Sequence, residues 1–298
     1  MVAELRIDVN SVMRELDLAL GLLTESRIVS RYRKIFKGKG MEFEDFRHYT
    51  PEDDASRIDW RASKRVNKLL IRRFKEERDM NVFFMVDVSS SMLFGSTEKL
   101  KHEYAAELVA ALSHFVLESG DRIGLVLFKD KVVKYLEPGK SEGHYFVLLR
   151  HLLTPEFYGG KYNLSKALNF LANIVTERSI VFVVSDFIGM EPNWGKALLA
   201  STGMLDGIGI MVRDPRDWKL PPEAGQVVIS DPFSNRVVLV DCGDEKARLE
   251  YENLVQKEAG MIRETFKKSM WDLLEVSTDE GFVTPILKFL KRREILFR

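Results

Sequence analysis

Three oxygen-bearing side chains, Asp87, Ser89 and Ser91, follow directly after an apolar run at 82–86. The run reads as a buried strand, and an amphipathic helix pattern begins near Lys99. A carboxylate and two hydroxyls therefore stand where a strand is followed by a helix, which is where ligands bind in open α/β sheets. All three groups are hard oxygen donors, which suit Mg²⁺ or Mn²⁺ better than zinc or copper.

A second carboxylate, Asp186, follows another apolar run, 181–184, that also reads as a buried strand. Two parallel strands lie side by side at the point where the strand order of a doubly wound sheet reverses. If these are the two strands, Asp186 lies close to Asp87 and its serines. Asp and Ser are also preferred helix N-cap residues, so the first triplet alone fits a capped helix equally well. The second aspartate favours a metal site.

A third loop, 159–163, also precedes an expected helix and is a possible part of the metal site. Gly160 permits close approach of the backbone, and Tyr162 and Asn163 carry a phenol and an amide oxygen. The five histidines have no zinc-ligand spacing, and the chain contains neither a P-loop nor a nucleophile elbow. No catalytic residue is therefore assigned.

The pattern from residue 81 onward alternates strands with helices, which predicts a mostly parallel sheet covered on both faces. The expected strands lie at 82–86, 123–128, 132–136, 180–185 and 207–212, and the expected helices at 99–118, 144–152, 164–176 and 194–201. The second and third strands are close enough in sequence to form an antiparallel hairpin at one edge. Further along we expect a hairpin over 227–240, a helix at 245–268, a strand at 273–276 and a helix at 284–291. The fold class is therefore α/β, with a doubly wound sheet of about six strands.

The first 78 residues differ from the rest and are expected to be an extension packed on a main domain of residues 79–298. A helix is predicted at 11–23, followed by alternating basic and acidic blocks and a strand at 69–71. Ordering such a charged segment costs about 1–2 kcal/mol per residue in backbone entropy. Burying large apolar side chains, at roughly 1.5–3 kcal/mol each, must offset that cost. The side chains expected to be at least partly buried are Phe43, Phe46, Trp60, Leu70 and Phe74.

Composition narrows the class of protein. The 298 residues are 45% hydrophobic, carry a formal net charge of zero and include one cysteine, Cys242. A neutral chain creates no field that draws it to nucleic acid or membrane, and a lone cysteine fits a reducing compartment. Residues 1–10 lack a signal-peptide core, and no stretch has the roughly 20 apolar residues of a membrane span. We expect a cytoplasmic protein that does not act at a membrane.

The candidate metal residues resemble a known pattern. Asp-x-Ser-x-Ser, a Gly-Gly-x-Thr loop and a strand-end Asp make up the metal-ion-dependent adhesion site of von Willebrand factor A-like domains. Asp87, Ser89, Ser91 and Asp186 match the first and last parts. The middle loop departs from the pattern, because Tyr162 stands where a threonine is expected; Asn163 or a water is the expected substitute. The resemblance implies a weakly bound Mg²⁺ or Mn²⁺.

A longer resemblance begins upstream. The segments 43–54, 57–63 and 69–79 are similar to the bacterial domain-of-unknown-function family numbered 58, whose members carry a von Willebrand factor A-like domain. The similarity runs from about residue 30 to the end. It implies a protein that acts as a partner or adaptor, because members of this family are often encoded beside MoxR-type AAA+ ATPases.

Together these features predict a non-enzymatic, metal-dependent protein-interaction module, with a MoxR-type ATPase or its client as the expected partner. One alternative is a metal-dependent hydrolase that uses Asp87 and Asp186. Another is RNA binding through the basic blocks at 31–39 and 57–73, although the acidic residues between them can pair with these blocks.

Overall fold

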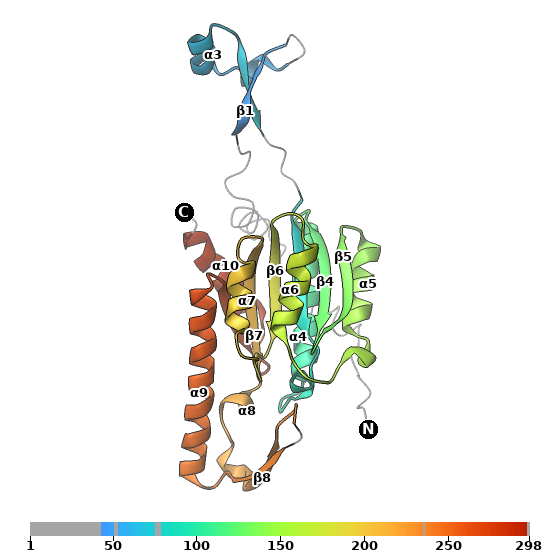
Figure 1. Ribbon diagram of the computed structural model, residues 1–298, viewed down its shortest axis with the longest axis vertical. Coiled ribbons are helices and arrows are strands. Elements are labelled where there is room, and N and C mark those ends of the chain that lie inside the picture. Colours follow the sequence, from blue (N-terminus) through green and yellow to red (C-terminus); the bar gives the residue numbers. More distant parts are fainter. Residues whose placement is uncertain (1–42, 51–52, 75–78, 235, 297–298) are drawn as a thin grey trace.

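The computed structural model describes residues 43–50, 53–74, 79–234 and 236–296. The helix predicted at 11–23 lies outside these residues. Within them the chain builds a central α/β domain, a small N-terminal unit and a separate two-stranded hairpin (Figure 1).

The central sheet has six strands in the order β10-β7-β6-β3-β4-β5. Their bounds are β3 Asn81–Asp87, β4 Arg122–Phe128, β5 Val132–Gly139, β6 Ser179–Ser185, β7 Leu205–Arg213 and β10 Asp272–Ser277. All neighbours pair in parallel except β5, which pairs antiparallel with β4 at the edge. The predicted doubly wound sheet and its antiparallel edge hairpin are therefore confirmed.

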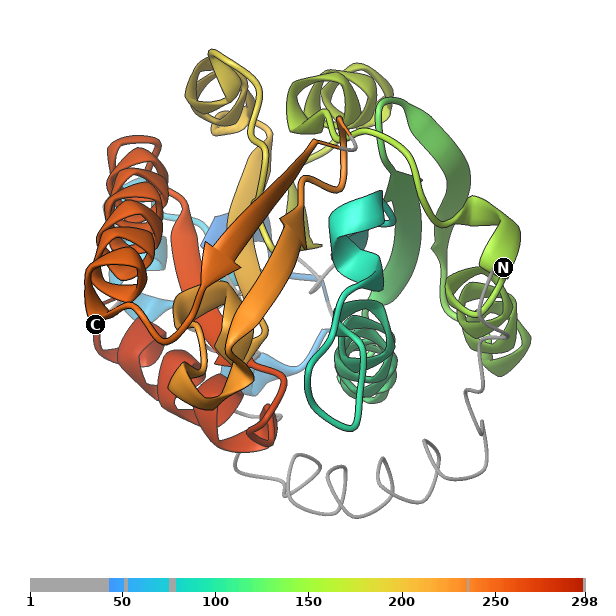
Figure 2. The same cartoon turned by 90° about the horizontal axis from the view of Figure 1, so that it is seen from below.

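Helices cover both faces of this sheet (Figures 1 and 2). Their bounds are α4 Lys101–Glu118, α5 Glu142–Leu152, α6 Leu164–Ile174, α7 Trp194–Ser201, α8 Pro215–Trp218, α9 Glu245–Lys268 and α10 Val283–Leu296. Alternate residues of β3 point to opposite faces. Phe84 packs in a core with side chains of α4, α5 and α10, whereas Met85 packs in a second core with α6, α7 and α9.

The two halves of the sheet meet between β3 and β6. Val86 of β3 is level with Val184 of β6, so Asp87 and Asp186 follow the carboxyl ends of adjacent parallel strands. Here the strand order reverses, and the loops that leave the two strands run to opposite faces of the sheet. The predicted neighbour relation of the two strands is confirmed.

A second hairpin lies at the same end of the molecule. It consists of β8 (Gln226–Ser230) and β9 (Val237–Asp241), which pair antiparallel and precede the long helix α9. Viewed from below, the hairpin crosses the carboxyl end of the central sheet (Figure 2). The sequence predicted both strands and the helix after them. No helix in the described part of the chain is long and apolar enough to cross a membrane.

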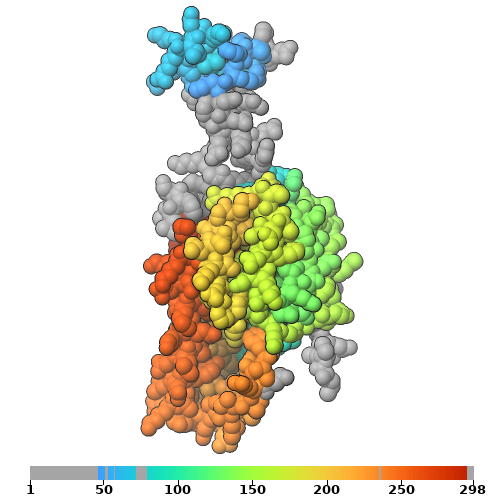
Figure 3. Space-filling view, viewed as in Figure 1, coloured from blue at the N-terminus to red at the C-terminus, as the bar shows by residue number. Residues whose placement is uncertain are grey.

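The N-terminal unit pairs β1 (Phe43–His48) with β2 (Leu70–Phe74) and adds helix α3 (Trp60–Val66). It lies beyond the amino ends of the parallel strands and projects from the central domain (Figures 1 and 3). Phe46 is 42% exposed and Trp60 is 68% exposed, so the expected burial of these two side chains is wrong. Leu70 is half-buried, in agreement with expectation, and the side chains of Phe43 and Phe74 lie outside the described part. The division at residue 78 stays a prediction.

Candidate functional site

Three of the predicted ligands meet at the carboxyl end of the sheet. Ser89 lies in the loop after β3, and Ser91 lies in the short 3-10 helix η2 (Ser90–Leu93). The two hydroxyl oxygens are 3.2 Å apart, and Ser91 donates a hydrogen bond of 3.1 Å to Oδ1 of Asp186. The backbone N–H of Ile188 also donates to this oxygen, at 3.0 Å. Residues 95 positions apart in sequence thus form one cluster of oxygens.

Asp87 stabilises this cluster through hydrogen bonds to neighbouring residues. Its Oδ1 accepts a hydrogen bond of 2.8 Å from the backbone N–H of Ser89, and its Oδ2 accepts one of 2.7 Å from the hydroxyl of Ser185. The Ser185 oxygen in turn accepts from the N–H of Phe187. Burial and the neighbouring Asp186 carboxylate raise the pKa of Asp87 to about 7. Sequence reasoning placed Ser185 in a strand and missed its contact with Asp87.

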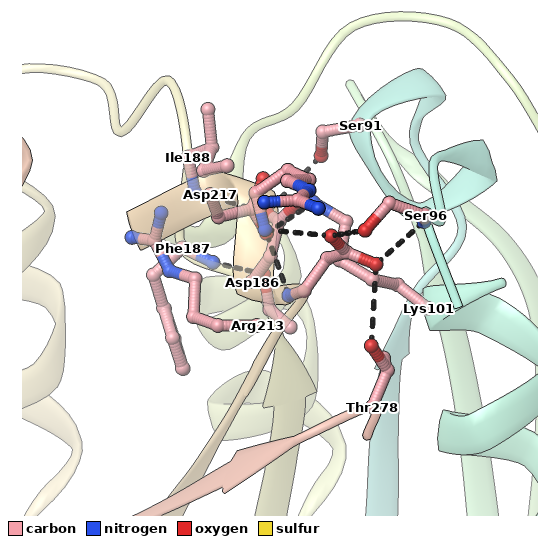
Figure 4. Close-up of polar contacts among 12 residues, drawn as sticks. Ser91, Ser96, Lys101, Asp186, Phe187, Ile188, Arg213, Asp217 and Thr278 are labelled. Carbon is pink, nitrogen blue, oxygen red and sulfur yellow. Dashed lines mark hydrogen bonds and ion pairs between the residues drawn. The ribbon is translucent and has the colours of Figure 1, made fainter. Parts of the chain in front are cut away.

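Lys101, which the sequence analysis did not assign to the site, contacts the second oxygen of the Asp186 carboxylate. Lys101 is 1% exposed, and its Nζ lies 2.6 Å from Oδ2 of Asp186 and 3.0 Å from Oδ2 of Asp217 (Figure 4). Burial alone would lower the pKa of Lys101, but the two carboxylates outweigh burial and raise that pKa. The amine is therefore an ammonium ion. Its position at the start of a helix, where the helix dipole disfavours cations, was a signal in the sequence.

The loop after β7 supplies the second acceptor of this lysine. Asp217 in α8 accepts a hydrogen bond of 2.9 Å from the N–H of Asp214, and burial raises the pKa of Asp217 although Lys101 opposes the shift. Asp214 accepts hydrogen bonds from the N–H of Ser96 and from the hydroxyl of Thr278, at 2.7 and 3.2 Å. These contacts join the loops that follow β3, β7 and β10.

The third loop packs on the first through its backbone. Gly160, at φ +104°, donates its N–H to Oγ of Ser90 at 2.8 Å and accepts the N–H of Ser90 at 3.0 Å. Tyr162 is buried, and its hydroxyl lies near Asp87 and Ser185 without hydrogen-bond geometry to a described residue. Burial and Asp87 raise the pKa of Tyr162 well above its usual range, so the phenol stays neutral. Asn163 caps helix α6, because its Oδ1 accepts the N–H of Lys166 at 2.9 Å.

The cluster is more enclosed than the sequence suggested. The place of Asp87 at the end of a strand of an open α/β sheet predicts a solvent-facing crevice, but the side chains of Asp87, Ser89 and Asp186 are fully buried. The ring of Phe94 lies 5.5 Å from Nζ of Lys101. The tip of the β8–β9 hairpin contributes Phe233, whose ring packs so tightly on Gly189 that an added Cβ would lie 2.4 Å from a ring carbon. The expectation of an open site is therefore wrong.

The spacing of the oxygens fits a small hard cation. Mg²⁺ binds oxygens at 2.0–2.1 Å in an octahedron, which places neighbouring ligands about 2.9 Å apart. The separations of 3.2 Å between the serine oxygens and 3.1 Å from Ser91 to Asp186 are close to this value. Ser89, Ser91 and Asp186 could hold Mg²⁺ or Mn²⁺ with small adjustments. Within the described ranges no group of three or more His, Cys, Asp or Glu side chains could hold a metal, so any site here depends on hydroxyls.

Comparison with known proteins identifies the family of this chain and two of its relatives. A family described as "Protein of unknown function DUF58" matches residues 45–260. An uncharacterized protein of Mycobacterium tuberculosis is 26% identical over 285 residues, which cover 95% of this chain and 89% of that protein. The uncharacterized protein YeaD of Bacillus subtilis is 31% identical over 107 residues, covering 36% of this chain and 24% of that protein.

A solved structure is similar over most of its length. The crystal structure of an aerotolerance-related membrane protein from Bacteroides fragilis matches with a TM-score of 0.50 and 17% identity. The match covers 72% of this chain and 99% of the chain in that crystal structure. At this level of identity the likeness concerns the fold alone. The expected α/β fold, a mostly parallel sheet of six strands covered by helices, is confirmed, whereas a metal at the carboxyl end of the sheet stays a prediction.

Proposed function

Because the chain belongs to the family of unknown function DUF58 and has a von Willebrand factor A-like fold, we propose that it is a non-enzymatic protein-interaction module that works with a divalent cation. The recognition face is the carboxyl end of the sheet, around Asp87 and Asp186.

The observation that carries the proposal is the spacing of three oxygens. Ser89, Ser91 and Oδ1 of Asp186 would hold the Mg²⁺ or Mn²⁺, and Asp87 would orient the loop through its bond to the N–H of Ser89. When bound, the cation would supply a coordination site for a carboxylate of the partner. We expect weak affinity, on the order of millimolar for Mg²⁺ alone, because hydroxyls carry no charge.

Exposed apolar side chains near the site support an interaction role. Leu93 and Phe94 of the first loop are exposed. In the β8–β9 hairpin, Val228 lies opposite Leu239, and Val237 lies two residues before Leu239 on the same strand. The three side chains therefore share one face of the hairpin, and all three are exposed. Apolar surface beside a recessed polar group is typical of protein-binding sites.

The partner that we propose is a MoxR-type AAA+ ATPase or its client, in the cytoplasm. The resemblance to the family supports this partner, and the lone buried cysteine, Cys242, supports the compartment.

A hydrolase is the second candidate, and one observation favours it. A carboxyl group with a pKa of about 7, as Asp87 has, suits general acid–base catalysis at neutral pH. Both Asp87 oxygens already accept hydrogen bonds from Ser89 and Ser185, however, and Asp87 is buried. We therefore place the interaction role first.

Binding to the ATPase tests the proposal. Purified full-length protein should bind a MoxR-type ATPase from the same organism in Mg²⁺ and lose at least 10-fold in affinity in EDTA. Asp87→Ala should show the same loss with the fold intact by circular dichroism, whereas Glu118→Ala, an exposed residue at the opposite end of α4 from Lys101, should bind normally. Equal binding with and without EDTA would refute metal dependence. Phosphatase, nuclease or ATPase turnover that disappears in both Asp87→Ala and Asp186→Ala would establish the hydrolase instead.

A further inference from the structure

The two oxygens of Asp186 face two different surroundings. Oδ1 accepts hydrogen bonds from the hydroxyl of Ser91 and the N–H of Ile188, on the side of the proposed metal. Oδ2 lies 2.6 Å from Nζ of Lys101. The Asp186 carboxylate thus contacts the Lys101 ammonium through Oδ2, and its Oδ1 lies on the side where a divalent ion would bind.

The placement of Lys101 is costly and is held by several contacts. A buried ammonium loses its hydration, and the first turn of a helix disfavours positive charge. The chain compensates with a second carboxylate, Asp217, at 3.0 Å from Nζ. The aromatic ring of Phe94 lies 5.5 Å from the ammonium, and the carbonyl of Phe94 accepts the backbone N–H of Lys101 at 2.9 Å. The lysine is therefore held at the site rather than folded outward into solvent.

We propose that Lys101 is a tethered cation that shares Asp186 with the divalent ion and thereby sets the affinity of the site for metal. This inference rests on the proposed function, because it concerns the same oxygens. Two cations on one carboxylate repel each other, and burial strengthens the repulsion because little water screens it. Each cation therefore weakens the binding of the other. The consequence is a site that releases its metal readily and fills only at high Mg²⁺ concentration or when a partner adds negative charge.

Removing the ammonium tests the inference. Lys101→Met keeps the length of the side chain and deletes its charge, and Lys99→Met deletes a charge two residues away that pairs with Glu107 instead of Asp186. The full-length variants are titrated with Mn²⁺ by calorimetry and by the loss of the free-ion electron paramagnetic resonance signal. Lys101→Met should bind Mn²⁺ about 10- to 100-fold more tightly than the wild type, as expected for removing a buried like charge. Lys99→Met should bind as the wild type does.

Thermal unfolding supplies a second readout. Lys101→Met leaves Asp186 and Asp217 without their cation, so its melting temperature should fall in EDTA and recover in Mg²⁺ by more than that of the wild type. If Lys101→Met does not fold, Lys101→Met with Asp217→Asn removes one of the two stranded acids and should also bind Mn²⁺ more tightly than the wild type.

The outcomes separate the inference from the proposed function. Equal Mn²⁺ affinity in wild type and Lys101→Met overturns the inference and leaves a metal-dependent module in place. Tight binding by Lys101→Met with no detectable binding by the wild type supports the inference and shows that Lys101 excludes the metal from the free protein. The EDTA experiment on the ATPase complex then decides whether partner binding depends on metal. Binding by neither protein overturns the inference, and the EDTA experiment on the ATPase complex then decides the proposed function separately.

Discussion

At the scale of single residues, the candidate site is a buried cluster in which almost every polar group has an assigned partner. Asp87 accepts from Ser89 and Ser185, and Asp186 accepts from Ser91 and Lys101. The hydroxyl of Tyr162 has no hydrogen-bond partner among the residues that the structure describes. A buried polar group without a hydrogen bond destabilises a fold by about 1–3 kcal/mol. This residue is also the one that departs from the adhesion-site pattern.

Replacing Tyr162 by Phe should therefore raise the free energy of unfolding by about 1 kcal/mol, because the substitution removes only the unpaired hydroxyl. Urea unfolding at neutral pH measures the change, and Mn²⁺ titration should give an unchanged affinity. Tyr158→Phe is the matched control, since its hydroxyl donates to the carbonyl of Leu152 at 2.6 Å and its removal should destabilise the protein. A loss of Mn²⁺ affinity in Tyr162→Phe would make the phenol a metal ligand in place of the missing threonine.

The residues that the sequence could predict are those with a local signature. Asp87 and Asp186 each follow a long apolar run, so their place at strand ends was evident from sequence position alone. Lys101 has only the weak signature of a cation at a helix start, and Asp217 in α8 has none, because the contact between them joins residues 116 positions apart in sequence. The contact between Lys101 and Asp217 could be identified only from the three-dimensional structure.

At the scale of elements, the site is covered by the β8–β9 hairpin. The sequence predicted this hairpin from two short apolar runs around a turn, but nothing in the periodicity placed it across the central sheet. One close contact joins the hairpin to the loop after β6. Phe233 packs on Gly189, which has φ +71°, a conformation that favours glycine.

Substituting Gly189 by Ala should loosen the hairpin, because a methyl group there meets the Phe233 ring. Hydrogen exchange of residues 226–241 should become faster, and Mn²⁺ should bind and leave more quickly. Gly225→Ala provides the control, since Gly225 also has positive φ, at +64°, but open space around its Cβ position. Both positions have positive φ, so both variants carry backbone strain, and the clash with a side chain is added only in Gly189→Ala. Identical exchange in the two variants would show that Phe233 does not hold the hairpin.

At the scale of the whole molecule, the alternating pattern was enough to predict the central domain. The central strands β3 and β6 are buried on both faces, as their unbroken apolar runs predict. The N-terminal unit could not be placed in the same way. Phe46 and Trp60 were expected to be partly buried because ordering a charged segment needs compensating apolar burial, yet both are exposed. The elements that carry them, β1 and α3, lie at the far end of the molecule from the candidate site (Figure 1). The unit instead gains its order from local contacts, such as the pairing of β1 with β2 and the capping of α3 by Asp59.

The most direct test of the central claim is a crystal structure of the full-length protein grown in Mn²⁺, with anomalous diffraction measured at the manganese edge. The account predicts a peak about 2.2 Å from the hydroxyl oxygens of Ser89 and Ser91 and from Oδ1 of Asp186. A density map with no peak at these oxygens, at a Mn²⁺ concentration well above millimolar, would contradict it. A peak held by other residues, with Ser91 still bonded to Asp186, would contradict it as well.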